Sequence, residues 1–230
     1  MAKSNVLAAT LLAGGIISEA VGRTHRQVRQ HRKAWEAQNF RTLNQLKKDD
    51  FLLVALGDSA TQGVGAARID QSYVARLAQM IPGSVRVVNL SISGATIETM
   101  LAAQLPQLRG LELKPDLVVA NIGGNDVGAP HITPELFSAY AKRMARELPG
   151  PALVGNIPSF SFLPREQLAA ELSAILDEQM SAAGHVPVDL RRLSQQYSTW
   201  EYLTRYHAPD LFHPNARAYA AWALEFGSHL

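Results

Sequence analysis

Residues 51–59 read FLLVALGDS, and this stretch decides the fold. An unbroken apolar run that ends at a glycine is typical of a buried parallel strand followed by a tight turn. In that arrangement Gly57 opens the turn and Ser59 lies at the C-terminal edge of the strand. Ligands of open α/β sheets bind at this edge, so we expect any groups that act together with Ser59 to come from the ends of other strands.

A strand–helix rhythm continues from this stretch to the C-terminus. The pattern predicts strands at residues 51–56, 85–90, 116–122, 152–157 and 186–190. It predicts helices at residues 72–81, 96–105, 134–148, 165–183 and 215–226. Alternating strands and helices with short connections indicate a parallel sheet covered on both faces. We therefore expect an α/β fold, a three-layer αβα sandwich of five parallel strands. We also expect these strands to follow the flavodoxin-like order.

Composition limits the function classes. The chain has 230 residues with 47% hydrophobic content, enough for one large α/β domain. It has no cysteine, which excludes disulfides, thiolate metal sites and a cysteine nucleophile. Its 7 histidines show neither HExxH nor paired-histidine spacing, so we expect no metal site and no cofactor.

Charge is distributed unevenly along the chain. Residues 1–50 hold 9 Lys and Arg against 4 Asp and Glu, whereas residues 51–230 hold 13 against 16. The basic character thus belongs to the N-terminal segment, and the slightly acidic remainder argues against nucleic-acid binding. We place a domain boundary here, with an N-terminal segment at residues 1–50 and one main domain at residues 51–230.

The N-terminal segment permits three interpretations. Residues 6–17, VLAATLLAGGII, are apolar but shorter than the roughly 20 residues of a membrane-spanning helix. They fit an export signal cleaved after Ala20, a membrane-associating anchor, or a helix packed on the domain. A following basic cluster opposes export and favours a cytoplasmic location; it consists of Arg23, Arg26, Arg29, Arg32 and Lys33.

The pattern of residues 24–48 predicts an amphipathic helix with a narrow apolar seam. The seam residues are Val28, Trp35, Leu43 and Leu46. Its basic face is either solvated or in contact with anionic lipid.

Residues that can act as a nucleophile or as hydrogen-bond donors follow three of the predicted strands. Ser59 follows the first, Gly94 lies in the segment after the second, and Asn125 follows the third. Because parallel strands end at one edge, these residues are expected to lie together. Asp210 and His213, in DLFH, precede the last predicted helix.

This set of residues suits acyl transfer. A serine hydroxyl needs a neighbouring base, and histidine supplies one near neutral pH. A carboxylate fixes the histidine tautomer, and an aspartate three residues earlier reaches it when the segment folds as a turn. An oxyanion needs donors that are already in place, which a glycine backbone N–H and an asparagine side chain provide.

The GDS, glycine, GGND and DLFH blocks, in this order, resemble the SGNH hydrolases, also called the GDSL esterase/lipase family. The resemblance runs from about residue 51 to the C-terminus and does not cover residues 1–50. It implies Ser59 as nucleophile, His213 as general base and then acid, and Asp210 as the residue that orients His213. It implies an oxyanion hole made of the Ser59 and Gly94 N–H groups and the Asn125 side chain.

The resemblance implies a serine esterase that hydrolyses carboxylic esters through an acyl-serine intermediate. The substrate remains open among small-molecule, lipid and carbohydrate esters and thioesters. An acyltransferase would use the same residues, and a non-catalytic binding module could share the fold. These alternatives stay open at this point.

Several neighbouring residues have plainer interpretations. We interpret Asp58 and Asp126 as hydrogen-bonding residues that shape the loops, not as catalytic groups. His207 precedes Asp210 without the DxxH spacing and ranks behind His213 as the base. Residues 158–164 and the aromatic-rich residues 197–206 are candidates for lining a substrate pocket.

Overall fold

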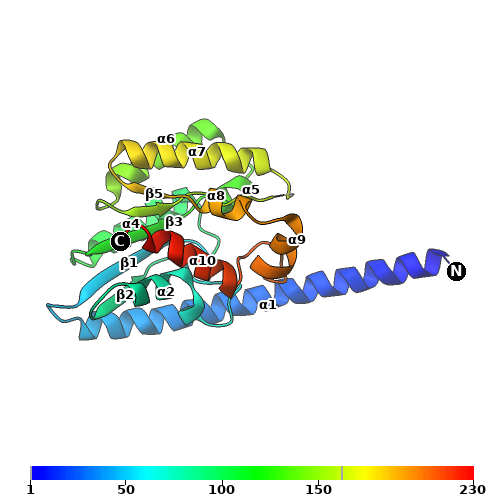
Figure 1. Ribbon diagram of the computed structural model, residues 1–230, viewed down its shortest axis with the longest axis horizontal. Coiled ribbons are helices and arrows are strands. Elements are labelled where there is room, and N and C mark those ends of the chain that lie inside the picture. The colour runs from blue at the N-terminus through cyan, green and yellow to red at the C-terminus, as the bar shows by residue number, and fades with distance from the viewer. Residues whose placement is uncertain (1, 162) are drawn as a thin grey trace.

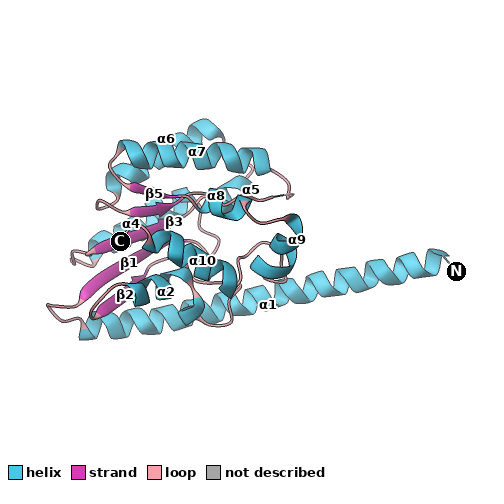
Figure 2. Ribbon diagram, in the orientation of Figure 1, coloured by secondary structure: helices cyan, strands magenta, loops and turns pink. Residues whose placement is uncertain are grey.

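The computed structural model describes residues 2–161 and 163–230, and it describes the side chains from residue 22 onward in those ranges. Figure 1 shows a central sheet between two layers of helices, with a long N-terminal helix along one side. Figure 2 shows the strands as one continuous layer. This is the three-layer arrangement expected from the alternating pattern.

The sheet has five parallel strands in the order β2-β1-β3-β4-β5. Their bounds are Phe51–Gly57 (β1), Val85–Asn89 (β2), Leu117–Asn121 (β3), Leu153–Gly155 (β4) and Val186–Val188 (β5). This order is the flavodoxin-like one, so the predicted fold class is confirmed. Strand β2 lies on one side of β1, whereas β3, β4 and β5 follow on the other side. Such a change of side places a crevice between the carboxyl ends of β1 and β3.

The helices follow the predicted rhythm, with additional short segments. The longer helices are α1 (Ala2–Gln45), α2 (Tyr73–Met80), α6 (Pro134–Glu147), α7 (Glu166–Ala182) and α10 (Ala216–Gly227). The short ones are η1 (Ile69–Gln71), α3 (Ile97–Thr99), η2 (Met100–Gln104), α4 (Leu105–Gly110), α5 (Gly124–Gly128), α8 (Leu190–Gln195), α9 (Thr199–Glu201) and η3 (Tyr202–Tyr206).

Local signals fix the ends of several elements. The Thr133 side chain accepts the Leu136 N–H and caps α6, as its position before Pro134 predicts. Gly184 has φ 82° just beyond α7, the left-handed conformation that ends many helices. Strand β5 is shorter than predicted because Asp189 caps α8 by accepting the Arg192 N–H.

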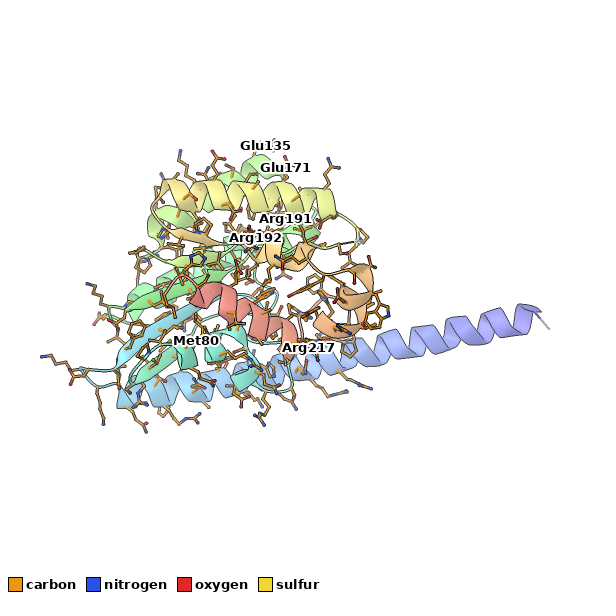
Figure 3. The ribbon with its side chains drawn as sticks, viewed as in Figure 1. Met80, Glu135, Glu171, Arg191, Arg192 and Arg217 are labelled. Atoms are coloured by element: carbon orange, nitrogen blue, oxygen red, sulfur yellow. The ribbon has the colours of Figure 1, made fainter. Side chains whose placement is uncertain are left out.

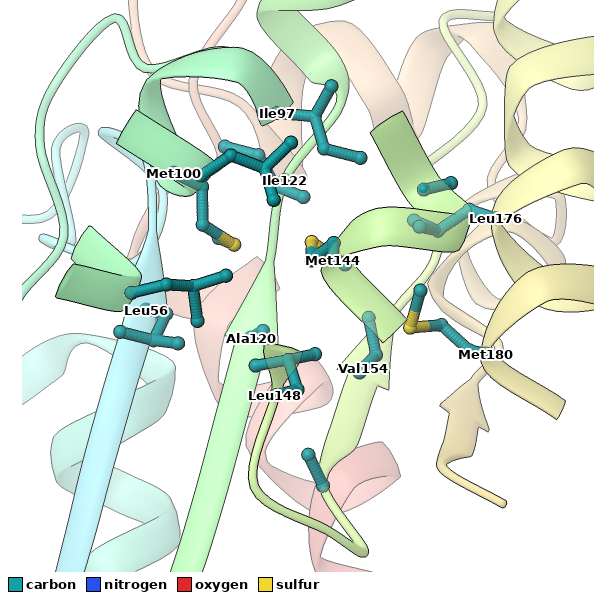
Figure 4. Close-up of a cluster of buried hydrophobic side chains, with 14 of the residues drawn as sticks. Leu56, Ile97, Met100, Ala120, Ile122, Met144, Leu148, Val154, Leu176 and Met180 are labelled. Carbon is teal, nitrogen blue, oxygen red and sulfur yellow. The ribbon is translucent and has the colours of Figure 1, made fainter. Parts of the chain in front are cut away.

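Two apolar clusters cover the two faces of the sheet. Alternate residues of β1 belong to different clusters: Val54 and Leu56 face one side, and Leu53 faces the other. Figure 4 shows the first cluster, where side chains of α6 and α7 such as Met144 and Leu176 meet the sheet. Full burial of each such side chain contributes about 1.5–3 kcal/mol. Charged residues occupy the outer surface of this layer, as Glu135 and Glu171 show in Figure 3.

Helix α1 is a single helix of 44 residues. Its N-terminal part projects beyond the body of the molecule in Figure 1. The side chains of residues 6–17 lie outside the described ones, so the export and anchor interpretations and the boundary at residue 50 stay predictions. Among the described residues, no helix has an apolar stretch long enough to cross a membrane.

The docked part of α1 contacts the body mainly through polar groups. Trp35 is buried as predicted, but Leu43 is 39% exposed, so the predicted apolar seam is wrong at that position. Instead, the Asn39 side chain pairs with both the N–H and the carbonyl of Asn89, and Thr42 donates to the Val87 carbonyl. These bonds satisfy backbone groups on the outer edge of β2, which would otherwise be an unpaired sheet edge.

Candidate active site

The turn after β1 presents Ser59 at the carboxyl end of the sheet. Gly57 has φ 145°, and a Cβ there would lie 2.3 Å from the Asn121 carbonyl oxygen. Only glycine fits both the conformation and this close approach. The buried Gln104 side chain accepts the Gly57 N–H at 2.8 Å and donates to the Gly57 carbonyl at 2.7 Å. These contacts fix the strand end from which Ser59 follows.

Ser59, His213 and Asp210 form a continuous chain of hydrogen bonds. The Ser59 Oγ lies 2.9 Å from His213 Nε2, and His213 Nδ1 lies 2.8 Å from Asp210 Oδ2. With the Nδ1 proton donated to the carboxylate, Nε2 is left as the acceptor that faces the serine hydroxyl. The structure thus brings together three of the residues selected from the sequence.

A narrow turn carries both Asp210 and His213. The Ala208 N–H donates to the His213 carbonyl at 2.8 Å, which closes the base of the turn. Within it, Leu211 has φ 59°, a left-handed conformation uncommon outside glycine and asparagine. Asn215 then caps α10 by accepting the Arg217 and Ala218 N–H groups.

The Asp210 carboxylate accepts hydrogen bonds on both oxygens. Oδ1 accepts the Phe212 and His213 N–H groups, and Oδ2 accepts from His213 Nδ1 and from the Thr24 hydroxyl. Burial alone would raise the pKa of Asp210, but the hydrogen bonds and charge of His213, with the Thr24 hydroxyl, hold it well below its ordinary value. Asp210 is therefore a carboxylate at neutral pH.

Asn125 lies between the segments that carry Ser59 and Gly94. Its side-chain amide donates to the Ala95 carbonyl at 2.9 Å and, more weakly, to Asp58 Oδ2 at 3.2 Å. Gly94 is exposed in the turn after β2. Within the described residues, neither the Ser59 N–H nor the Gly94 N–H donates to a backbone carbonyl. Both groups therefore remain available as donors.

Asp58 and Asp126 shape the surrounding loops, in line with their interpretation from the sequence. Asp58 accepts the Ala60 N–H at 2.9 Å, and Asp126 accepts the Ile97 N–H through both oxygens. Burial raises the pKa of Asp58 to about 6 and that of Asp126 to about 7, although these hydrogen bonds oppose the rise. Asp126 thus ties the loop of Asn125 to the segment that follows Gly94.

A small pocket of about 70 Å³ opens beside Ser59 and His213. Its apolar and aromatic lining comes from both candidate segments and from the turn that carries Asp210 and His213: Pro158, Phe160, Tyr197, Tyr202 and Phe212. Neither Gly94 nor Asn125 is among the described residues that line it. The pocket therefore offers an apolar space that is separate from these two donors.

His207 lines the same pocket but has a different environment from His213. Its Nδ1 lies 3.0 Å from the Tyr202 carbonyl oxygen, and its ring stacks on the Tyr202 ring with centroids 3.5 Å apart. Burial lowers the pKa of His207 to about 4, which keeps the ring neutral at physiological pH. It has no hydrogen bond to Ser59 or Asp210 among the described contacts.

Sequence patterns did not identify Thr24 or Gln104 as residues near the site. Both contact the site through side-chain hydrogen bonds to partners far along the chain, separated by 186 and 47 residues. No local motif encodes such pairs. Among the described residues, no cluster of three or more His, Asp or Glu side chains is arranged to hold a metal ion.

A parallel α/β sheet with linked serine, histidine and aspartate side chains at its carboxyl edge is an arrangement that serine hydrolases use. The model of the GDSL-like lipase/acylhydrolase family matches residues 55–221. The chain belongs to this family and is an ester hydrolase of the GDSL type. Helix α1 lies entirely outside the matched residues.

Solved structures with the same fold support this placement. A lipase/acylhydrolase from Enterococcus faecalis aligns with a TM-score of 0.65 at 22% identity, covering 78% of this chain and 94% of its own. LAE5, an alpha/beta hydrolase enzyme from the metagenome of Lake Arreo, aligns with a TM-score of 0.62 at 23% identity, covering 77% of this chain and 94% of its own. A catalytic mutant of an acetylxylan esterase from Geobacillus stearothermophilus aligns with a TM-score of 0.62 at 20% identity, covering 76% of this chain and 92% of its own. No curated protein matches the sequence significantly.

Proposed function

We propose that the protein hydrolyses carboxylic esters through an acyl intermediate on Ser59. The observation that carries the proposal is the chain of contacts from Ser59 Oγ to His213 Nε2 and from His213 Nδ1 to Asp210, at 2.9 and 2.8 Å. The first distance lies within the range in which a base accepts a proton from a nucleophile, and the second is that of a hydrogen bond that orients the base.

In acylation, the Ser59 oxygen attacks the ester carbonyl carbon while His213 Nε2 takes the hydroxyl proton. The tetrahedral intermediate collapses, and His213 returns that proton to the departing alcohol oxygen. In deacylation, His213 deprotonates a water that attacks the acyl carbon, and Ser59 leaves with the proton. The Asp210 carboxylate keeps Nδ1 protonated and stabilises the imidazolium in both half-reactions.

The oxyanion donors in this proposal are the N–H groups of Ser59 and Gly94 and the Asn125 amide. The Asn125 contact to Asp58, at 3.2 Å, is longer than its contact to Ala95, at 2.9 Å. The N–H that points to Asp58 is the more weakly held of the two, so it is the one that we expect to donate to a developing oxyanion. The Ala95 contact then keeps the amide in place.

The pocket beside Ser59 supports a short acyl group. Its volume of about 70 Å³ is well below the roughly 300–1,000 Å³ of pockets that hold drug-sized ligands. Its walls include Phe160 and Phe212, whose rings meet edge to face with centroids 6.2 Å apart. An acyl chain of a few carbons fits such an apolar space, whereas a fatty acyl chain would extend past these rings.

Turnover of p-nitrophenyl acetate, butyrate and octanoate tests both parts of the proposal. We expect kcat/KM to fall sharply between butyrate and octanoate, and we expect Ser59→Ala to abolish turnover of all three. Ser181→Ala, an exposed serine on α7, is the matched control and should retain wild-type rates. Turnover by Ser59→Ala would contradict the nucleophile, and equal rates on all three esters would contradict the short acyl pocket.

A further inference from the structure

Helix α1 reaches the proposed catalytic centre although it lies outside the matched family region. The Thr24 hydroxyl donates to Asp210 Oδ2 at 2.7 Å, and the two residues are 186 positions apart. Asp210 and His213 are largely buried, with side chains 10% and 12% exposed. A hydrogen bond to a carboxylate in such surroundings is stronger than one between neutral groups on an open surface.

The hydrogen bond from Thr24 to Asp210 comes from a different segment of the chain than three other hydrogen bonds that this carboxylate accepts. The Phe212 N–H, the His213 N–H and His213 Nδ1 all belong to the turn that carries Asp210. The backbone donors hold Oδ1, whereas Thr24 holds Oδ2, the oxygen that accepts from the imidazole. The hydroxyl therefore limits rotation of the carboxylate about its Cβ–Cγ bond and fixes the direction in which Oδ2 meets His213.

The neighbouring residues of α1 hold Thr24 in this position. One turn further along, the Gln27 side chain accepts the Gly65 N–H at 3.2 Å and donates to the Ala66 carbonyl at 3.1 Å. Trp35 donates to the Gln62 carbonyl at 3.0 Å from a buried position. These bonds attach α1 to the loop that follows Ser59.

That loop also supports the catalytic turn. A Cβ at Gly65 would lie 2.2 Å from the Pro214 carbonyl oxygen and 3.1 Å from His213 Cβ, so the backbone at Gly65 lies directly against them. Through Thr24 and Gln27, helix α1 therefore contacts the turn that carries Asp210 and the loop against which that turn packs.

We propose that Thr24 is a positioning residue for ester hydrolysis and that helix α1 is part of the active site. The inference rests on the proposed function, because it assigns Asp210 to the orientation of His213. Without the Thr24 hydroxyl, the carboxylate rotates more freely and His213 spends less time aligned with Ser59. Substrate binding at the pocket is unaffected, because Thr24 is not among its described lining residues.

Thr42 provides a matched control on the same helix. Its side chain is buried and donates one hydrogen bond to the body, to the Val87 carbonyl at 3.1 Å. Thr42→Val thus removes one hydroxyl contact between α1 and the sheet, as Thr24→Val does, but away from Asp210. A general weakening of helix docking would affect both variants alike.

The experiment measures kcat and KM for p-nitrophenyl acetate, and the rate of labelling by a fluorophosphonate, in full-length Thr24→Val, Thr24→Ser and Thr42→Val. For Thr24→Val we expect kcat and the labelling rate to fall by about tenfold, since a hydrogen bond to a charged group contributes about one to two factors of ten. KM should stay within about twofold of wild type. Thr24→Ser should recover most of the loss, and Thr42→Val should keep wild-type kcat.

Wild-type kcat in folded Thr24→Val would overturn the inference, and so would an equal loss in Thr42→Val without recovery in Thr24→Ser. If Thr24→Val does not fold, Thr24→Ala replaces it under the same criteria. Failure of the proposed function has a different signature. In that case wild type is not labelled, or Ser59→Ala is labelled, whatever the behaviour of the Thr24 variants.

Discussion

Helix α1 and helix α10 both contact the sheet region near the catalytic residues, but they use different interactions. Helix α10 buries Tyr219, Trp222 and Phe226 in an apolar cluster beneath the sheet. Helix α1 buries Trp35 there, and many of its other contacts to the body are side-chain hydrogen bonds to backbone groups of β2 and of the loop after Ser59. Apolar packing is non-directional, whereas these hydrogen bonds require one register of the helix against the sheet.

This difference has a functional consequence. Apolar burial has no directional requirement, so it suits a helix whose task is to complete the core. The directional bonds of Gln27 to the loop after Ser59 hold the part of α1 that places Thr24 at Asp210. The helix that lies outside the family match is thus attached by directional bonds, which suit the positioning role that we propose for Thr24 at Asp210.

The largest expected loss of kcat comes from a substitution outside helix α1, at Asn125. Asn125→Ala should lower kcat by about 10²–10³, the usual loss for one oxyanion donor, with little change in KM. The contacts of Asn125 to Ala95 and Asp58 make a moderate loss of stability an expected side effect, so thermal unfolding is measured in parallel. An unchanged kcat in the folded variant would remove Asn125 from the oxyanion hole.

A second prediction concerns pH and the pocket wall. In the native protein the pKa of His207 is lowered to about 4. In the unfolded chain the same side chain takes up a proton near pH 6.5, whereas native His207 stays neutral there. The stability due to neutral His207 is complete above about pH 6.5 and is lost as pH falls towards 4. His207→Asn keeps an N–H donor for the Tyr202 carbonyl but does not titrate.

Urea unfolding at pH 7 and pH 4.5 measures this difference. Wild type should lose about 2 kcal/mol more stability than His207→Asn over this interval. The raised pKa values of Asp58 and Asp126 act in the opposite direction, but they are common to both proteins and cancel in the comparison. Equal losses in the two proteins would show that native His207 takes up its proton near pH 6.5.

The smallest expected effect sharpens the contrast between the two helices. Asn39→Ala removes the paired contacts of α1 to Asn89 and should lower the free energy of unfolding by about 1–2 kcal/mol. Since Asn39 does not contact the catalytic residues, kcat should stay within about twofold of wild type. A tenfold loss of kcat here would mean that overall docking of α1, and not the Thr24 hydroxyl alone, controls the site.

The elements with strong local patterns were predictable from the sequence. The apolar run of β1, the capping residue Thr133 and the terminal glycine Gly184 each encode their structure within a few residues. The parallel sheet covered by helices on both faces also followed from the alternation of strands and helices, whereas alternation alone does not fix the order of the strands. Strand ends were less accurate at β4 and β5, where tertiary contacts such as the Asn156 side chain on Asp189 end the sheet early.

The site was predictable only where residues are gathered by the fold itself. Ser59 and Asn125 follow strands that end at one edge, and Asp210 and His213 share one turn, so their proximity follows from the topology. Thr24 reaches Asp210 because polar side chains near it, such as Gln27, position α1 against the loop after Ser59, and no hydrophobic periodicity encodes these contacts. The Leu43 prediction was wrong for the same reason.

Labelling by a fluorophosphonate, followed by peptide mass spectrometry, tests the central claim most directly. The account predicts one adduct per chain, located on Ser59, with its formation strongly slowed in His213→Ala because the base that activates the hydroxyl is lost. Folded wild-type protein that takes up no label would contradict the account. An adduct on a different residue, or one that forms equally fast in His213→Ala, would contradict it as well.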